Sequence, residues 1–183
     1  MLLYRQTVED FGLFAGREME TSEIDDLKIA NGEMSAKMRA VRIVSACNVS
    51  KKDLQQRLIR KGESPDNAEQ AVTWLEDLNL IDDRVTAEHI VDRCISKGYG
   101  IARAKQALYE KRVPRELWED VLTDYPDQSE KITAFLRSRL SENADYKDIR
   151  RVTDALLRQG HSYSQIRKCF SQLALNMDEL PEE

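Results

Sequence analysis

Apolar residues recur every three or four positions along most of this chain, which is the spacing that places them on one face of an α-helix. The pattern is most regular after Glu33, where it predicts a first long helix, a second helix over 51–61 and a third that begins at Pro65. Seven glycines and four prolines are few for 183 residues, so breaks between helices are few. The pattern therefore predicts an all-α protein.

A break in the pattern follows the third helix. Either carboxylate of the pair Asp82-Asp83 can accept the free N–H groups of a new first turn, so we expect another helix to start near Arg84. Leu80 and Ile81 lie just before this pair and are expected to pack inward.

The helix that starts there carries one apolar face and is followed by two glycines. The apolar residues of this face are Ala87, Ile90, Val91, Cys94 and Ile95. Gly98 and Gly100 come next, and glycine adopts the left-handed conformation that ends a helix at little cost. We interpret Asp82, Asp83, Gly98 and Gly100 as structural residues that set the angle between neighbouring units.

The same order of helices returns twice along the chain. The middle helix of each unit ends in a similar segment, in which Leu58, Leu108 and Leu156 correspond at spacings of 50 and 48 residues. This alignment also matches apolar positions of the third helices, namely Ala68, Trp118 and Ile166, then Val72, Leu122 and Phe170, and then Leu75, Tyr125 and Leu173. A unit of about 45 residues buries little apolar surface alone, so neighbouring units are expected to stack.

These patterns predict three tandem three-helix repeats in an elongated, curved array, preceded by a short N-terminal extension. The predicted segments are an acidic N-terminal extension over 1–32, repeats over 33–81, 82–126 and 127–175, and an acidic tail over 176–183. Within the extension, we expect a short helix over 23–30 that Asn31-Gly32 ends.

The net charge of −5 is unevenly distributed. Residues 1–35 and 176–183 are acidic, whereas the body between them carries a small positive net charge. Free duplex DNA is bound largely by clustered Lys and Arg that neutralise its phosphates. A chain that is acidic overall is therefore a poor candidate for strong binding to free DNA, although its body could dock on a nucleoprotein.

The three cysteines, Cys47, Cys94 and Cys169, stand far apart, and each lies on an apolar face, which favours buried thiols in a reducing compartment. No paired Cys or His spacing offers a ligand set, so neither a metal nor a cofactor is expected. No apolar run approaches the roughly 18 residues of a membrane span, and the N-terminus lacks a signal-peptide pattern. We expect a cytoplasmic protein with no membrane contact.

Positive charge is densest in the last unit. On the helix expected over 145–159, Arg151 and Arg158 are seven residues apart and share a face, with Lys147 close by. The candidate contact residues of this unit are Lys147, Arg150, Arg151, Arg158, Arg167 and Lys168. They form either a stripe that faces phosphates or a solvated helix face that pairs with neighbouring aspartates.

No catalytic arrangement stands out in the sequence. It contains no glycine-rich phosphate loop and no nucleophile or metalloprotease motif, and adjacent carboxylates on a helix point in different directions. We therefore expect no enzymatic activity. A helix-turn-helix that reads bases is also disfavoured, because two of the three third helices are acidic.

The segment LIDDRVTAEHIVDRCISKGYGIARAKQAL resembles the central signature of the RecX family, which comprises bacterial regulators of the RecA recombinase. The signature positions fall on Leu80, Ile81, Asp82, Asp83, Ala87, Arg93, Lys97, Gly98, Gly100 and Arg103. The resemblance extends over about residues 36–173, since KKDLQQRLIRKG and LLRQGHSYSQI are similar to the family's first and third units. Departures from the family pattern occur at Val85-Thr86, where Arg-Phe is usual, at Arg112, where glycine is usual, and at His161, where an aromatic residue is usual.

This resemblance implies a non-enzymatic regulator in DNA repair, homologous recombination and the SOS response. Such a protein binds within the groove of the RecA filament on DNA and usually inhibits its ATPase and strand exchange. Arg93, Lys97 and Arg103 join the basic residues of the last unit as expected contacts, and weak binding to single- or double-stranded DNA and a monomeric state are expected. Two alternatives stay open, a stand-alone DNA-binding helical repeat protein and a protein-interaction scaffold.

Overall fold

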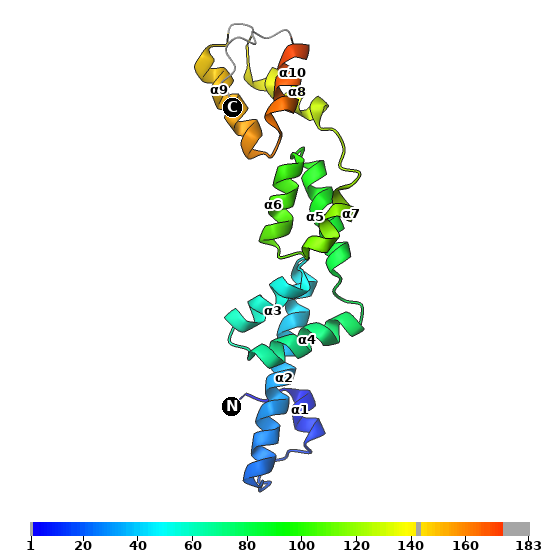
Figure 1. Ribbon diagram of the computed structural model, residues 1–183. Coiled ribbons are helices and arrows are strands. Elements are labelled where there is room, and N and C mark those ends of the chain that lie inside the picture. The colour runs from blue at the N-terminus through cyan, green and yellow to red at the C-terminus, as the bar shows by residue number, and fades with distance from the viewer. Residues whose placement is uncertain (1, 142–143, 174–183) are drawn as a thin grey trace. The chain divides into compact units, whose positions relative to one another are not determined.

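The computed structural model describes residues 2–141 and 144–173, and every regular element within these ranges is a helix (Figure 1). The helices are α1 (Arg5–Asp10), α2 (Thr21–Ala46), α3 (Lys51–Arg60), α4 (Pro65–Asp77), α5 (Asp83–Ser96), α6 (Ile101–Glu110), the 3-10 helix η1 (Arg115–Leu117), α7 (Trp118–Leu122), α8 (Ser129–Arg139), α9 (Tyr146–Arg158) and α10 (Tyr163–Gln172). The predicted all-α class is confirmed. The predicted acidic tail over 176–183 lies outside the described residues.

The chain divides into two compact units, Met1–Thr86 and Ala87–Glu183. The first unit contains an apolar core around Leu58, formed by α2, α3 and α4. The second unit contains two separate cores, one around Leu108 among α5, α6 and α7, and one around Leu156 among α8, α9 and α10. All three leucines, which correspond to one another in the alignment of the three repeats, are fully buried. This arrangement is consistent with three three-helix repeats, whereas the residues at which the repeats begin and end stay predictions.

The middle helices α3, α6 and α9 are all followed by a residue in the left-handed conformation. The φ angles are 94° at Gly62, 54° at Arg112 and 87° at Gly160. Arginine pays about 1 kcal/mol for this conformation, whereas glycine adopts it freely. The helix ending is therefore the same in each repeat, including the repeat in which arginine replaces glycine.

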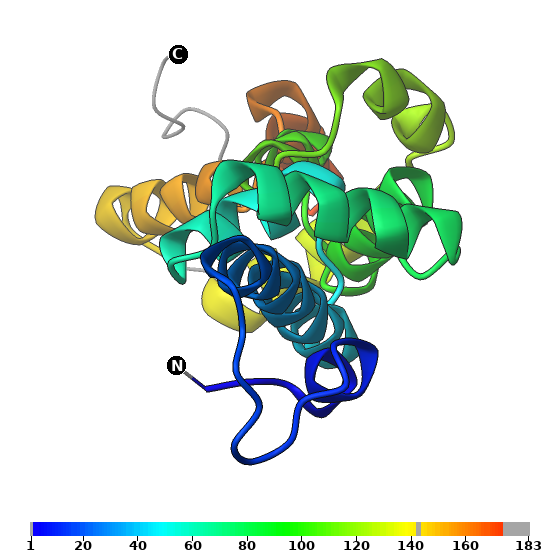
Figure 2. The ribbon, with the colours of Figure 1, turned by 90° about the horizontal axis from the view of Figure 1, so that it is seen from below.

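The N-terminal extension departs from the prediction, because α2 continues without a break through Asn31 and Gly32. The Asn31 side chain accepts a hydrogen bond from the Tyr4 N–H (3.1 Å) and donates one to the Leu2 carbonyl (3.0 Å). A methyl group at Gly32 would lie 2.8 Å from Nδ2 of Asn67 on α4. The prediction that these residues end a helix is wrong, because they make tertiary contacts that hold the N-terminal segment and α4 close to α2 (Figures 1 and 2).

Two predictions about burial are also wrong. Cys94 and Cys169 are buried, but Cys47 is exposed, because it follows the last residue of α2 in extended backbone and leaves that helix's apolar face. Ile81 is buried as predicted, whereas Leu80 is 56% exposed. The chain has left the helix at this point, so consecutive side chains no longer follow one helix face.

Candidate partner-binding surface

The exposed face of α9 is basic. The Asp145 carboxylate accepts the Asp148 N–H (2.8 Å) and starts the helix, and Ile149 and Leu156 anchor the opposite face in the core of the third repeat. The predicted contact residues on the outer face, all exposed, are Lys147, Arg150, Arg151 and Arg158. Their arrangement follows from the helix period, because the buried residues Ile149, Val152, Thr153 and Leu156 lie on the opposite side of the helix.

One ion pair lies on this face, between Arg151 and Asp148. The Nη1 of Arg151 lies 3.5 Å from the Asp148 carboxylate, and the two side chains are 79% and 50% exposed. Such exposed pairs contribute about 0–1 kcal/mol, so a partner's phosphate or carboxylate can replace Asp148 easily. This pair therefore does not prevent Arg151 from contacting a partner.

The helix α10 adds two more exposed cations, Arg167 and Lys168. Its start is fixed by a capping box, in which the Ser162 hydroxyl accepts the Gln165 backbone N–H and the side-chain Oε1 of Gln165 accepts the Ser162 backbone N–H (3.2 Å). The amide of a glutamine side chain is one of the groups that can form hydrogen bonds to base edges. The use of Gln165 in the cap further disfavours base reading by this helix.

The other predicted contacts, Arg93, Lys97 and Arg103, gather around the buried thiol of Cys94. Burial raises the pKa of Cys94, and the positive charges of these three side chains oppose that increase. Arg93 and Lys97 are exposed, whereas Arg103 is partly covered. The structure thus places these three cations in one region of the second repeat.

Arg103 already has an internal partner. Its Nη1 lies 3.1 Å from the Glu110 carboxylate, and hydrogen bonds from Gln106 and Arg103 lower the pKa of Glu110. This pair links the two ends of α6. Arg103 is therefore a weaker candidate for a partner contact than the freely exposed residues of α9.

The second and third repeats meet backbone to backbone where α6 begins and α9 ends. The Gly100 N–H donates to the Gln159 carbonyl (2.9 Å), and the Ala102 N–H donates to the Gly160 carbonyl (3.3 Å). A methyl group at Gly160 would lie 2.3 Å from the backbone nitrogen of Arg103. The structure therefore brings Arg103 next to the end of α9, where Arg158 lies, although 55 residues separate them in the sequence.

The aspartate pair serves two helices instead of one. The Asp82 carboxylate accepts the N–H groups of Arg84 (2.6 Å) and Val85 (3.2 Å) at the start of α5, as predicted. The Asp83 carboxylate is buried and accepts the Lys51 N–H (2.8 Å) at the start of α3. Burial raises the pKa of Asp83, and this hydrogen bond opposes the increase. Both carboxylates therefore have structural roles.

Two residues near the contact between the second and third repeats have structural roles that the sequence did not indicate. Lys131 of α8 donates from Nζ to the carbonyl of Ile95 (2.5 Å) at the end of α5. His161 is buried next to Gly160, and its Nδ1 has no hydrogen-bond partner among the described residues. Burial lowers the pKa of His161, and a hydrogen bond to the Gly98 backbone opposes this decrease. Only the tertiary contacts reveal these roles, because the partners lie far away in the sequence.

Other kinds of site receive no support from the described part of the chain. Within residues 2–141 and 144–173, no group of three or more His, Cys, Asp or Glu side chains is placed to hold a metal ion. No helix in the same ranges is long and apolar enough to cross a bilayer. The basic faces of α9 and α10 and the cations around Cys94 are thus the candidate surface.

Comparison with known proteins points to one family. A family model described as the second three-helix domain of RecX matches residues 82–122. The regulatory protein RecX of Clostridium perfringens strain SM101 is 26% identical over 183 residues, which cover 96% of this chain and 83% of that protein. The regulatory protein RecX of Clostridioides difficile strain 630 is 26% identical over 184 residues, which cover 97% of this chain and 85% of that protein.

Solved structures share the fold. The crystal structure of RecX from Lactobacillus salivarius superposes with a TM-score of 0.67 at 25% identity, covering 80% of this chain and 99% of that one. Another crystal structure of a regulatory protein RecX gives a TM-score of 0.69 at 20% identity, covering 94% of this chain and 87% of that one.

Proposed function

Because the chain belongs to the RecX family, whose members are regulatory proteins, we propose that it is a non-enzymatic regulator that binds the RecA nucleoprotein filament and inhibits its ATPase and strand exchange. It acts in the cytoplasm as a monomer, in DNA repair and homologous recombination. The basic face of α9 provides the principal contact.

The observation that carries this proposal is the exposure of four cations on one side of one helix, namely Lys147, Arg150, Arg151 and Arg158. A helix of 13 residues extends for about 20 Å, so these charges can meet several phosphates or carboxylates along a filament. Each exposed contact is weak, but contacts that form together on one rigid helix add up.

The proposal is tested by ATP hydrolysis of RecA on single-stranded DNA. We expect the wild-type chain to lower the hydrolysis rate, and Arg151→Glu with Arg158→Glu to require about tenfold more protein for the same effect. Arg42→Glu with Arg60→Glu is the matched control, because both arginines are exposed and the change in net charge is the same. The proposal would be contradicted if the wild-type chain left ATP hydrolysis unchanged. It would also be contradicted if the control variant lost as much inhibition as the α9 variant.

Direct binding to DNA is the alternative that the same basic face favours. A salt titration of DNA binding without recombinase separates the two, because phosphate contacts make affinity fall steeply with salt. Dissociation constants of about 10⁻⁴ to 10⁻⁶ M near physiological salt are typical of non-specific binding and support the filament proposal. Much tighter binding to DNA alone would favour the stand-alone DNA-binding protein.

A further inference from the structure

We propose that a second copy of this chain docks its α9 on an acidic, tryptophan-bearing face of α4, so that weak self-association covers the basic face of α9. The inference rests on the proposed function, because it describes how the filament-binding face is regulated. Self-association and filament binding then compete for the same cations.

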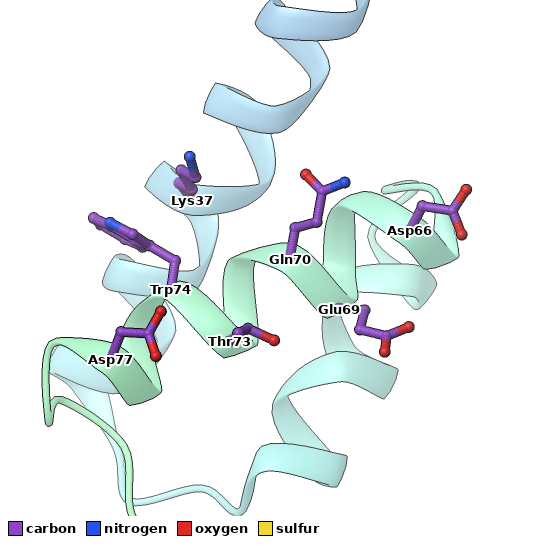
Figure 3. A pocket seen from close by; sticks show the side chains of 7 residues that line it. All are labelled: Lys37, Asp66, Glu69, Gln70, Thr73, Trp74 and Asp77. Atoms are coloured by element: carbon purple, nitrogen blue, oxygen red, sulfur yellow. The ribbon is translucent and has the colours of Figure 1, made fainter.

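The face of α4 forms a pocket of about 500 Å³ with an acidic rim (Figure 3). Asp66, Glu69 and Asp77 are exposed on this helix, and Trp74 and Gln70 line the pocket between them. Carboxylates beside an aromatic ring attract a cation by charge and by the ring's negative face. The pocket therefore suits a basic side chain of a partner.

A cation already lies at this ring within the chain. The Nζ of Lys37, on α2, is 5.8 Å from the centroid of the Trp74 ring, and Trp74 is partly buried (Figure 3). Lysine is a strongly hydrated charge on a flexible stem, whereas a guanidinium is planar and stacks on aromatic faces. An arginine from a partner can therefore displace Lys37 from the indole. The favoured occupant is an arginine-rich helix.

The chain itself carries a helix with matching charges. Both α4 and α9 have 13 residues. At positions i, i+3, i+7 and i+11, which lie on one helix face, the α4 residues are Asp66, Glu69, Thr73 and Asp77. At the same four positions, the α9 residues are Lys147, Arg150, Asp154 and Arg158.

Side-by-side parallel packing aligns these two faces with three pairs of opposite charge. In the fourth pair, Thr73 lies opposite Asp154, and its hydroxyl can donate to the carboxylate. In the same register, Arg151 lies opposite Gln70, one turn before Trp74, so its guanidinium can reach the pocket. Antiparallel packing instead brings Glu69 close to Asp154, and like charges repel. The parallel arrangement is favoured.

Both faces are present on every copy, so the contact is of the head-to-tail kind, in which one copy's α4 binds the next copy's α9. Exposed ion pairs contribute little, so the association is weak, and dilute protein remains the monomer predicted from the sequence. Salt weakens the association further, because the Debye length falls from about 10 Å at 0.1 M to about 3 Å at 1 M.

Sedimentation velocity on the full chain tests the proposal with two charge-reversed variants. Glu69→Lys with Asp77→Lys makes α4 basic, and Arg150→Glu with Arg158→Glu makes α9 acidic. At low salt we expect the wild type to associate as its concentration rises, and each variant alone to associate about tenfold more weakly. An equimolar mixture of the two variants regains association, because the basic α4 of one meets the acidic α9 of the other.

A mixture that sediments no faster than the separate variants would overturn the proposal, provided that circular dichroism shows both variants folded. Filament binding separates this failure from failure of the proposed function, because the Glu69→Lys, Asp77→Lys variant keeps α9 unchanged and should bind filaments at least as well as the wild type. If the mixture associates but the wild type does not bind filaments, only the proposed function is contradicted. If the mixture does not associate but the wild type binds filaments through α9, only this inference is overturned.

Discussion

Replacing Gly100 with alanine probes the contact between the second and third repeats. Gly100 has φ −76° and ψ 163°, which alanine adopts without strain. The substitution therefore acts only through the steric clash of the added methyl group. The added methyl group would lie 2.0 Å from the carbonyl oxygen of Gly160 and 2.5 Å from the backbone nitrogen of His161. These are backbone atoms, so no change of rotamer can relieve the clash, and the two repeats must separate.

The expected loss follows from two terms. Overpacking of a close contact costs about 1–3 kcal/mol. Separation also breaks the hydrogen bond from the Gly100 N–H to Gln159, which contributes about 0.5–1.5 kcal/mol. The free energy of unfolding should therefore fall by about 2–4 kcal/mol. That is a large share of the 5–15 kcal/mol typical of a folded domain.

Urea unfolding of the full chain measures this loss, and hydrogen exchange at the Ala102 N–H reports the contact itself. Gly32→Ala is the matched control, because its methyl group would meet only the end of the flexible Asn67 side chain, at 2.8 Å. Alanine is also favoured over glycine within a helix by about 0.5–1 kcal/mol, so the control should stay within about 1 kcal/mol of the wild type. Equal stability of the Gly100 and Gly32 variants would refute the argument.

Three further substitutions test individual contacts. Burial lowers the pKa of His161, so the unfolded chain binds a proton at this residue at a higher pH than the folded chain does. The stability of the wild type should therefore fall as the pH drops through about 6.5. His161→Phe should flatten this pH dependence in thermal unfolding, and an unchanged dependence would contradict the role of His161. Asp83→Ala removes the acceptor of the Lys51 N–H and should lower the unfolding free energy by about 1 kcal/mol, whereas Asp83→Asn, which keeps an acceptor, should lose less. The Tyr125 hydroxyl donates to the Tyr99 carbonyl (2.7 Å), so Tyr125→Phe should lower the free energy of unfolding by about 0.5–1.5 kcal/mol in urea. Burial raises the pKa of Tyr125 to about 12, so the same substitution should leave the number of phenols that titrate near pH 10 unchanged.

The repeat pattern was accessible from the sequence because it depends on local rules. Leu58, Leu108 and Leu156 follow the helix period, and burial of apolar faces makes that period visible in the chain. The residues after the middle helices adopt positive φ, including Arg112, where the alignment alone indicated the position of a helix ending. Local propensity and burial agree at these positions, so the sequence was sufficient.

Contacts between distant segments were not accessible in this way. Asn31 and Gly32 are typical of helix ends, yet tertiary contacts with Leu2 and Asn67 place them inside α2. Gly100 was interpreted as a helix ending, but its lack of a side chain is required by Gly160 of the next repeat. A single sequence contains no signal for such pairs, because nothing in it shows which distant residues meet.

The candidate surface could be predicted from the sequence only in part. Exposure of the α9 cations follows from the helix period, whereas the ion pair between Arg103 and Glu110 depends on how the two long side chains bend toward each other along α6. The approach of Arg103 to the end of α9 depends on packing between repeats. The sequence thus indicated which residues are charged and exposed, but not which of them already have a partner.

Co-sedimentation with RecA filaments on single-stranded DNA tests the central proposal most directly. The wild-type chain should pellet with the filaments at a concentration at which it stays in the supernatant with DNA alone. Arg151→Glu with Arg158→Glu should remain largely in the supernatant, while Arg42→Glu with Arg60→Glu should pellet like the wild type. A wild-type chain that does not pellet with the filaments, or an α9 variant that pellets as well as the wild type, would contradict the account.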